Sequence, residues 1–109
     1  MNRFRLAAAA AIVAVCGFGA LGVALASAPA GVVIDNFAFG PMDITVPAGT
    51  TVTWNNNDDI PHTVRAVDGS FHSKPMDTDD SYSFTFAKPG VYSYFCSIHP
   101  KMVAKVIVK

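Results

Sequence analysis

Short stretches of alternating polar and apolar residues, separated by turn residues, run through the chain from about residue 33 onward. Alternation such as Ser81-Tyr82-Ser83-Phe84-Thr85-Phe86 turns one face of a strand to a core and the other to solvent. No comparable helical pattern occurs there. The pattern predicts an all-β sandwich, or a small barrel, of seven to eight short antiparallel strands. The expected strands are 33–39, 43–46, 51–55, 62–67, 81–86, 91–96 and 103–108, with a loop and at most one short strand in 70–80.

The first thirty residues have a different composition. Arg3 and Arg5 are followed by an uncharged run to residue 30 in which alanine, valine, leucine and glycine dominate. A basic start, an apolar run and small residues at its end are typical of a secretory signal peptide. Ala24-Leu25-Ala26 fits the usual cleavage pattern. We therefore expect residues 1–26 to be a signal peptide, residues 27–31 a short N-terminal segment, and residues 32–109 one folded domain.

Two other interpretations of residues 1–26 remain open. An apolar run of about 20 residues suffices to cross a bilayer, so the segment would also serve as an uncleaved membrane anchor. Cys16-Gly17 resembles a lipoprotein site, although Val15 is large for that processing. In every case the basic terminus stays inside and the rest of the chain is exported. The predicted location is periplasmic or exported, with a membrane-anchored domain facing the periplasm as the alternative.

The charge and the cysteine count of the mature domain limit the partners that it can bind and the states that its thiol can have. Residues 27–109 hold six lysines and arginines against eight aspartates, a net charge of 6 − 8 = −2. Without a basic stripe, a nucleic-acid partner is not expected. Cys96 is the only cysteine beyond residue 26, and an unpaired exported thiol is a liability unless it is buried, paired between chains or bound to metal. A domain this small buries a modest core and often needs a disulfide or a bound metal for stability. We expect a monomer.

Four candidate metal ligands occur at two places. His62 begins an expected strand, whereas Cys96, His99 and Met102 lie between the last two strands. Two imidazoles, a thiolate and a thioether are typical of a type I (blue) copper site. Because all four ligands come from the protein, no position is left for a substrate. We therefore predict an electron carrier and not an enzyme, cycling Cu(I)/Cu(II) between redox partners, with a copper storage or delivery protein as the alternative.

Other polar and aromatic residues are interpreted as ordinary surface or core residues. His72 lies in a polar loop and is expected to be exposed. Trp54 alternates within a strand and is expected to be in the core. The acidic runs Asp58-Asp59 and Asp77-Thr78-Asp79-Asp80 are interpreted as solvated turns, not as docking patches.

Over residues 32–109 the chain resembles the cupredoxins, the family that includes plastocyanins and azurins, and within it the amicyanins. The motifs that carry the resemblance are the segment 44–54, Pro61-His62, Pro89-Gly90-Val91-Tyr92 and residues 96–102. The Cys-x2-His-x2-Met spacing is the short loop of amicyanins. The resemblance implies a Greek-key sandwich, one copper ion, and electron transfer between a periplasmic donor and acceptor.

The resemblance also implies a role for each ligand. His62, Cys96 and His99 match the equatorial ligands, Met102 matches the axial one, and partners would dock near His99. Two positions depart from the family pattern. Thr63 stands where cupredoxins have an asparagine that ties the ligand loop together, so this tie must be weaker or differently made. Lys101 stands where amicyanins have an aromatic residue, which changes the charge at the docking surface.

Overall fold

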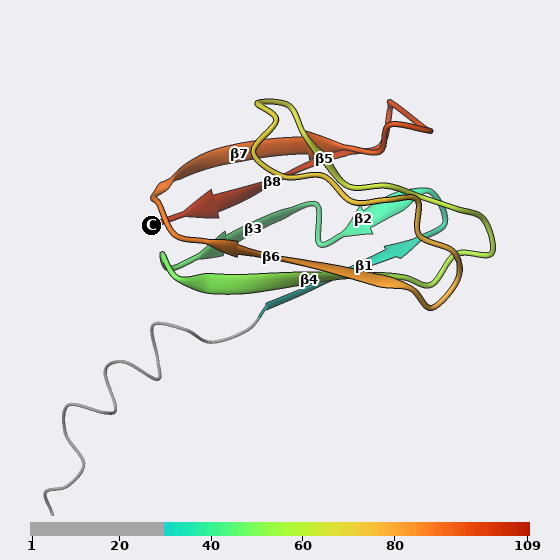
Figure 1. The fold of residues 1–109 in the computed structure, drawn as a ribbon, viewed down its shortest axis with the longest axis horizontal. Coiled ribbons are helices and arrows are strands. Elements are labelled where there is room, and N and C mark those ends of the chain that lie inside the picture. Colours follow the sequence, from blue (N-terminus) through green and yellow to red (C-terminus); the bar gives the residue numbers. More distant parts are fainter. Residues whose placement is uncertain (1–29) are drawn as a thin grey trace, which may run out of the picture.

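The computed structural model describes residues 30–109, so the expectations for residues 1–26 and most of 27–31 lie outside it. The described part contains eight strands and no helix (Figure 1). The expected all-β class is confirmed, with a strand count at the upper end of the range. Within residues 30–109 there is accordingly no helix that could cross a membrane. The strands are β1 (Ala30–Asp35), β2 (Ala38–Gly40), β3 (Asp43–Val46), β4 (Thr50–Asn56), β5 (Arg65–Ala66), β6 (Ser81–Phe86), β7 (Gly90–Phe95) and β8 (Val103–Val108).

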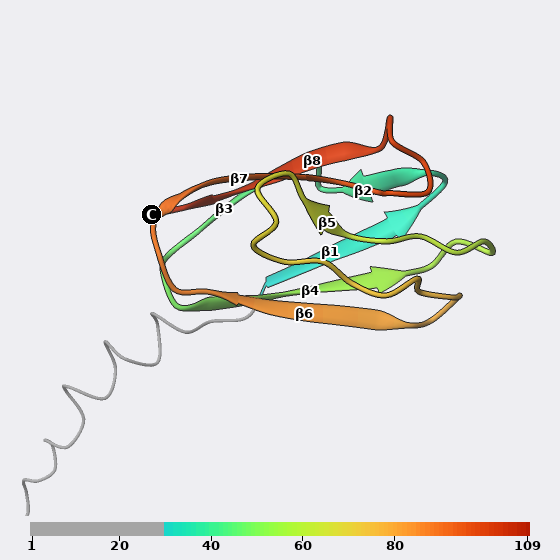
Figure 2. The same cartoon turned by 45° about the horizontal axis from the view of Figure 1, so that its top comes forward.

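The strands form two packed sheets of four, in the orders β2-β1-β4-β6 and β3-β8-β7-β5. Figure 2 shows the two layers, with β1, β4 and β6 on one side and β3, β7 and β8 on the other. Both sheets are mixed, because β1 runs parallel to β4 and β3 runs parallel to β8. The expectation of antiparallel strands is therefore wrong for these two pairs. Alternation reports which face of a strand is buried, but it carries no information on the direction of the neighbouring strand.

The expected single strand 33–39 is two strands joined by a turn. Asp35 pairs with Ala38, and the two residues between them, Asn36 and Phe37, have φ angles of 50° and 59°. The chain therefore reverses at this point and β2 pairs with β1. Because apolar residues continue through the turn, the alternation conceals it.

The core between the sheets is centred on Trp54, whose side chain is fully buried, as expected. Its ring lies 5.8, 6.4 and 5.5 Å from those of Phe71, Phe86 and Tyr94, within the range of favourable aromatic contacts. Tyr94 comes two residues before Cys96, so this core supports the strand that leads into the candidate ligands. His72 is exposed, as expected.

The segments that hold the candidate ligands meet at one end of the sandwich. The β1–β2 turn, the β4–β5 segment and the β7–β8 loop lie together at the right-hand end of Figure 1, opposite the C-terminus. Ring contacts of Phe37 with His62 and with His99 join the three segments.

Candidate metal centre

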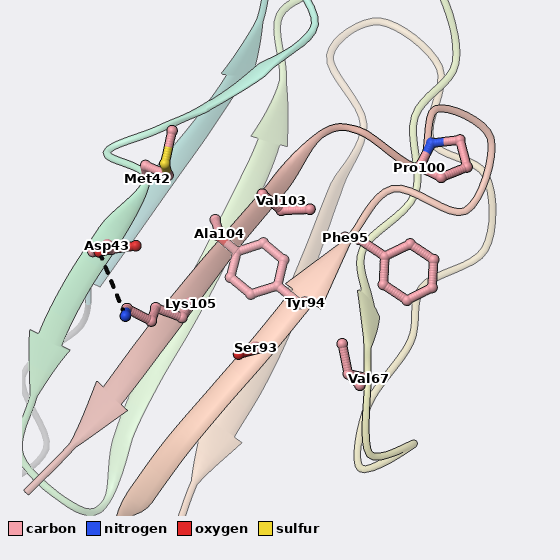
Figure 3. A pocket seen from close by; sticks show the side chains of 10 residues that line it. All are labelled: Met42, Asp43, Val67, Ser93, Tyr94, Phe95, Pro100, Val103, Ala104 and Lys105. Atoms are coloured by element: carbon pink, nitrogen blue, oxygen red, sulfur yellow. Dashed lines mark ion pairs between the residues drawn. The ribbon is translucent and has the colours of Figure 1, made fainter.

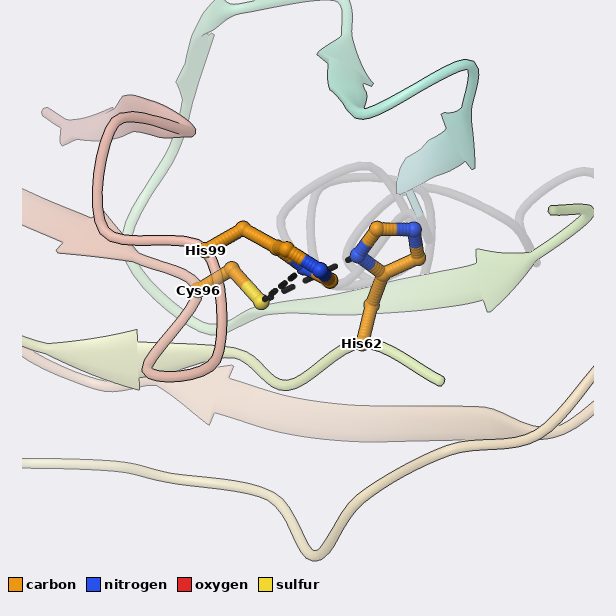
Figure 4. A group of neighbouring side chains, drawn as sticks. All are labelled: His62, Cys96 and His99. Carbon is orange, nitrogen blue, oxygen red and sulfur yellow. Dashed lines mark hydrogen bonds between the residues drawn. The ribbon is translucent and has the colours of Figure 1, made fainter. Parts of the chain in front are cut away.

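Three of the four predicted ligands converge on one point. The ligand atoms of His62, Cys96 and His99 all lie within 4.8 Å of one another (Figure 4). The Sγ atom of Cys96 is 3.8 Å from Nδ1 of His62 and 3.6 Å from Nδ1 of His99. Met102, the fourth predicted ligand, is buried at the end of the same loop and lines a surface hollow together with His99.

These separations fit a first-row transition metal. Metal–nitrogen bonds of about 2.0 Å and metal–sulfur bonds of about 2.3 Å, set about 120° apart, place nitrogen and sulfur roughly 3.7 Å from each other. The observed 3.6 and 3.8 Å agree with that value. A thiolate, two imidazoles and a nearby thioether are also the donors that copper prefers. The donor set and its spacing therefore suit a copper ion.

The β7–β8 loop is folded by its own backbone hydrogen bonds. The N–H of His99 donates to the carbonyl of Cys96 (3.2 Å), and the N–H of Met102 donates to the carbonyl of His99 (2.9 Å). A third bond runs from the N–H of Cys96 to the carbonyl of Met102 (3.1 Å) and closes the base of the loop. Three candidate ligands are thus held within seven residues by local hydrogen bonds.

The Cys96 sulfur is fully buried and receives a hydrogen bond from the backbone N–H of Thr63 (3.3 Å). Burial raises the pKa of this thiol, but hydrogen bonds from Thr63, His62, the Ile98 backbone and His99 outweigh it, and the pKa falls to about 6. At neutral pH the sulfur is therefore mainly a thiolate, which is the form that binds a soft metal.

Thr63 makes the hydrogen-bonded link to the ligand loop that the family pattern assigns to asparagine. Its Oγ1 accepts the backbone N–H of Ser97 (2.7 Å) and lies 2.8 Å from the Ser97 hydroxyl. The same Oγ1 is 3.7 Å from Cys96 Sγ. The β4–β5 segment is thus bonded to the β7–β8 loop beside the sulfur, so the tie is present but differently made.

Asp58 is a site residue that the sequence interpretation missed. Its Oδ2 lies 2.7 Å from Nε2 of His62 and also accepts the backbone N–H of Phe37 (3.0 Å). These two bonds, that of Phe37 foremost, hold the pKa of the Asp58 carboxyl below its ordinary value. The prediction of a solvated turn is wrong for Asp58, which is buried, whereas Asp59 is exposed. A carboxylate shortly before a candidate ligand histidine was the available signal, because metal-bound histidines commonly pair with one.

The backbone of His62, like its ring, is held by hydrogen bonds. His62 and Met76 exchange two backbone hydrogen bonds of 3.1 and 2.8 Å. The buried amide of Asn56 donates to the carbonyls of Met76 (2.9 Å) and Ile60 (3.0 Å). The expected strand 62–67 is correspondingly shorter: only Arg65 and Ala66 belong to β5, and His62 forms an isolated bridge.

His99 is the more accessible of the two histidines. It is partly buried and borders a surface hollow of about 450 Å³, together with Phe37, Ile98, Pro100, Lys101 and Met102. Phe37 and Ile98 are 52% and 47% exposed, so the surface around His99 is largely apolar. The ring of Phe37 contacts both histidines; sequence reasoning gave no signal for it beyond an apolar residue in an expected strand.

Another hollow lies over β3, β7 and β8, on the outer face of their sheet (Figure 3). Met42, Val67 and Val103 border it, and Lys105 lies 4.0 Å from Asp43 at its edge. Neither histidine nor cysteine is among its lining residues. The metal-binding chemistry of the described residues is therefore at the loop end of the sandwich.

Comparison with known proteins agrees with this geometry. A family model described as a cupredoxin-like domain matches residues 6–108. The chain is 38% identical over 95 residues to an amicyanin of Paracoccus versutus, covering 80% of this chain and 72% of that protein. It is 37% identical over 116 residues to a chloroplastic plastocyanin of Tetradesmus obliquus, covering 94% and 80%. Among solved structures, a purple cupredoxin of Nitrosopumilus maritimus aligns with a TM-score of 0.70 at 36% identity, covering 73% of this chain and 99% of that one.

Proposed function

The chain belongs to the cupredoxin-like family, and from this membership we propose that it is a type I copper protein that carries single electrons between redox partners. His62, Cys96 and His99 would hold the copper, and Met102 would be the weak fourth ligand. The observation that carries the proposal is that the Nδ1 atoms of His62 and His99 lie 3.8 and 3.6 Å from the one thiolate sulfur of Cys96. When bound, copper supplies a one-electron Cu(I)/Cu(II) couple.

The protein's own bonds favour electron transfer over catalysis. The rings and the thiolate are held by hydrogen bonds with Asp58, Thr63 and the loop backbone. A site with preset ligands changes little when its metal is reduced, so electrons pass with little rearrangement. The relatives named amicyanin and plastocyanin support the same assignment of an electron carrier and not an enzyme.

Copper delivery is the rival function, and the two differ in what happens to the ion on reduction. The test is to load the protein with one copper ion and cycle it between oxidant and reductant in the presence of a Cu(I) chelator. A carrier with this enclosed site keeps its copper through many cycles. Transfer of the copper to the chelator at each reduction would support delivery instead.

Partners would dock over His99, the ligand nearest the surface. The exposed apolar side chains of Phe37 and Ile98 suit a small contact that forms and dissociates quickly. Lys101, at the edge of this surface, favours partners with an acidic rim. The proposed partners are therefore a donor and an acceptor redox protein with acidic contact surfaces, and the carrier is proposed to act as a monomer.

The location and the domain boundaries rest on residues 1–31 and remain proposals. We propose that residues 1–26 are removed on export, that residues 27–31 lead into the domain 32–109, and that the protein works in the periplasm. Mass measurement of the exported protein should show a chain that starts at Ser27. A full-length, membrane-extracted species would support the anchor.

A further inference from the structure

Phe37 occupies a backbone position at which glycine is preferred. Asn36 and Phe37 form the two-residue turn between β1 and β2, and both have positive φ angles, 50° and 59°. Turns of this kind favour Asn-Gly, because the second residue must adopt the left-handed conformation. A residue with a Cβ atom adopts it only at a cost in free energy. A bulky residue at such a position suggests that its side chain has a functional role.

The side chain of Phe37 lies against both candidate ligand histidines. Its ring makes T-shaped contacts with His62 (centroids 5.6 Å apart, planes at 89°) and with His99 (5.1 Å, 86°). The two imidazoles are 4.9 Å apart. All three separations lie in the range of favourable aromatic pairs. Since the Phe37 side chain is 52% exposed, burial in the core does not explain its presence.

The backbone of Phe37 is tied to the same site. Its N–H donates to Oδ2 of Asp58 (3.0 Å), and this oxygen lies 2.7 Å from Nε2 of His62. Phe37 therefore contacts the His62 ring directly and is linked to it through one carboxylate. A shift of the turn would disturb both contacts together.

His99 depends on Phe37 more than His62 does. Within residues 30–109, the His99 ring is placed by Cys96 Sγ and by its contacts with Phe37 and His62; no carboxylate bonds it. His99 and Phe37 both line a hollow that opens to solvent. Among the described residues, Phe37 is thus the one phenylalanine, tyrosine or tryptophan whose ring contacts the His99 ring.

We propose that Phe37 is a positioning residue that holds the imidazoles of His62 and His99 with their Nδ1 atoms facing Cys96 Sγ, and that it shields His99 from water. Its effect on copper rests on the proposed function, whereas its effect on the rings does not. Apolar cover over the ligands favours the less charged, reduced site. Loss of the ring should therefore loosen His99, speed copper release and lower the reduction potential.

The experiment compares Phe37→Leu, which removes the ring and leaves a smaller apolar side chain, with Phe37→Tyr, which keeps the ring. Asn36→Gly is the matched control, because it changes the neighbouring turn position without a ring contact. In the metal-free protein, NMR relaxation of the imidazole carbons should show greater His99 motion in Phe37→Leu alone. In the copper-loaded protein, Phe37→Leu should release copper to a chelator about tenfold faster at a lower reduction potential. Phe37→Tyr and Asn36→Gly should match the parent.

A further variant, Phe37→Gly, distinguishes the effect of losing the ring from the effect of changing the turn conformation. Because glycine relieves the turn, the denaturation midpoint should stay unchanged or rise while His99 motion increases. Parent-like His99 motion, copper release and potential in Phe37→Leu would overturn the proposal. So would a lowered midpoint with unchanged His99 motion in Phe37→Gly, since Phe37 would then be a packing residue. If the protein bound no copper at all, the proposed function would fail, but the metal-free relaxation would still decide the role of Phe37.

Discussion

The two segments that supply the ligands are built in opposite ways. The β4–β5 segment contributes one proposed ligand, His62, which is fully buried, hydrogen-bonded to Asp58 through its ring and paired with Met76 through its backbone. The β7–β8 loop contributes three proposed ligands within seven residues and holds them mostly by its own backbone hydrogen bonds. Its His99 is partly exposed beside a surface hollow. His62 is therefore fixed by buried hydrogen bonds, whereas His99 is accessible from the surface.

This difference separates two requirements of an electron carrier. Retaining a metal needs fixed, desolvated ligands, and a fully bonded buried network such as Asp58–His62 provides them. Exchanging electrons needs a ligand near the surface, which the loop provides in His99. The link between the segments is Thr63, whose backbone N–H bonds Cys96 Sγ and whose hydroxyl accepts the N–H of Ser97.

The largest effect is expected from replacing either histidine by glycine. His62→Gly and His99→Gly should each abolish the intense colour of the copper-loaded protein, because a nitrogen ligand is lost. Added imidazole should restore the colour in His99→Gly, where the hollow of about 450 Å³ admits it. It should not do so in His62→Gly, whose site is closed to solvent. Visible absorption during an imidazole titration measures this, and recovery in His62→Gly alone would reverse the comparison.

Asp58→Asn should weaken copper binding by about 10- to 100-fold, because the carboxylate that orients the His62 ring is lost. Asp59→Asn is the matched control, since Asp59 is exposed. Competition with a chelator measures the affinity. The pKa of Asp58 is lowered in the fold, so its contribution to stability is present above the ordinary carboxyl pKa of about 3.9 and is lost as the pH falls further. Equal affinities for both variants would mean that the internal bracing of His62 is unimportant.

Met102→Gln should keep its copper but have a lower reduction potential. A weak axial thioether contributes little to holding the ion but favours Cu(I), so an amide oxygen in its place favours Cu(II). Met42→Gln is the control, because Met42 is 58% exposed on the outer sheet face. A redox titration of both variants measures the shift. Complete loss of copper from folded Met102→Gln would show that the loop holds the ion through its methionine.

The smallest effect is expected at the outer edge of the loop. Lys101→Glu should slow electron transfer with an acidic partner at low salt and leave the visible spectrum intact, because it changes the encounter rate and not the site. Lys88→Glu makes the same charge change in the turn between β6 and β7, at the other end of the sandwich. Stopped-flow rates across ionic strength measure the effect. The docking surface would have to lie elsewhere if both variants behaved alike.

The sequence was sufficient to predict the sandwich and to nominate the four ligands, because both depend on local patterns. Alternation as in β6 reports burial residue by residue. The spacing of Cys96, His99 and Met102 places three ligands in one loop whatever the rest of the chain does. The structure brings His62 to the same point, as a site closed by the packed sheets requires.

Three features of the site region were not predicted from the sequence. Asp58 is buried because it bonds both His62 and the Phe37 backbone, and Phe37 is 21 residues away. The hydroxyl of Thr63 serves as a tie because Ser97 lies beside it, 34 residues away. The turn at Asn36 and Phe37 is hidden because its second residue is not the glycine that marks such turns. The contacts of Asp58 with Phe37 and of Thr63 with Ser97 are long-range, whereas the turn at Asn36 and Phe37 is local and lacks its usual marker.

The central claim is that Cys96 and the two histidines form a type I copper site that carries one electron. Absorption spectroscopy during a redox titration of the copper-loaded protein, with Cys96→Ser beside it, tests this claim most directly. The parent should show an intense visible band from thiolate-to-Cu(II) charge transfer, which disappears with one electron per copper and returns on oxidation. Cys96→Ser should show no such band. A weakly coloured parent, or undiminished colour in Cys96→Ser, would contradict the claim.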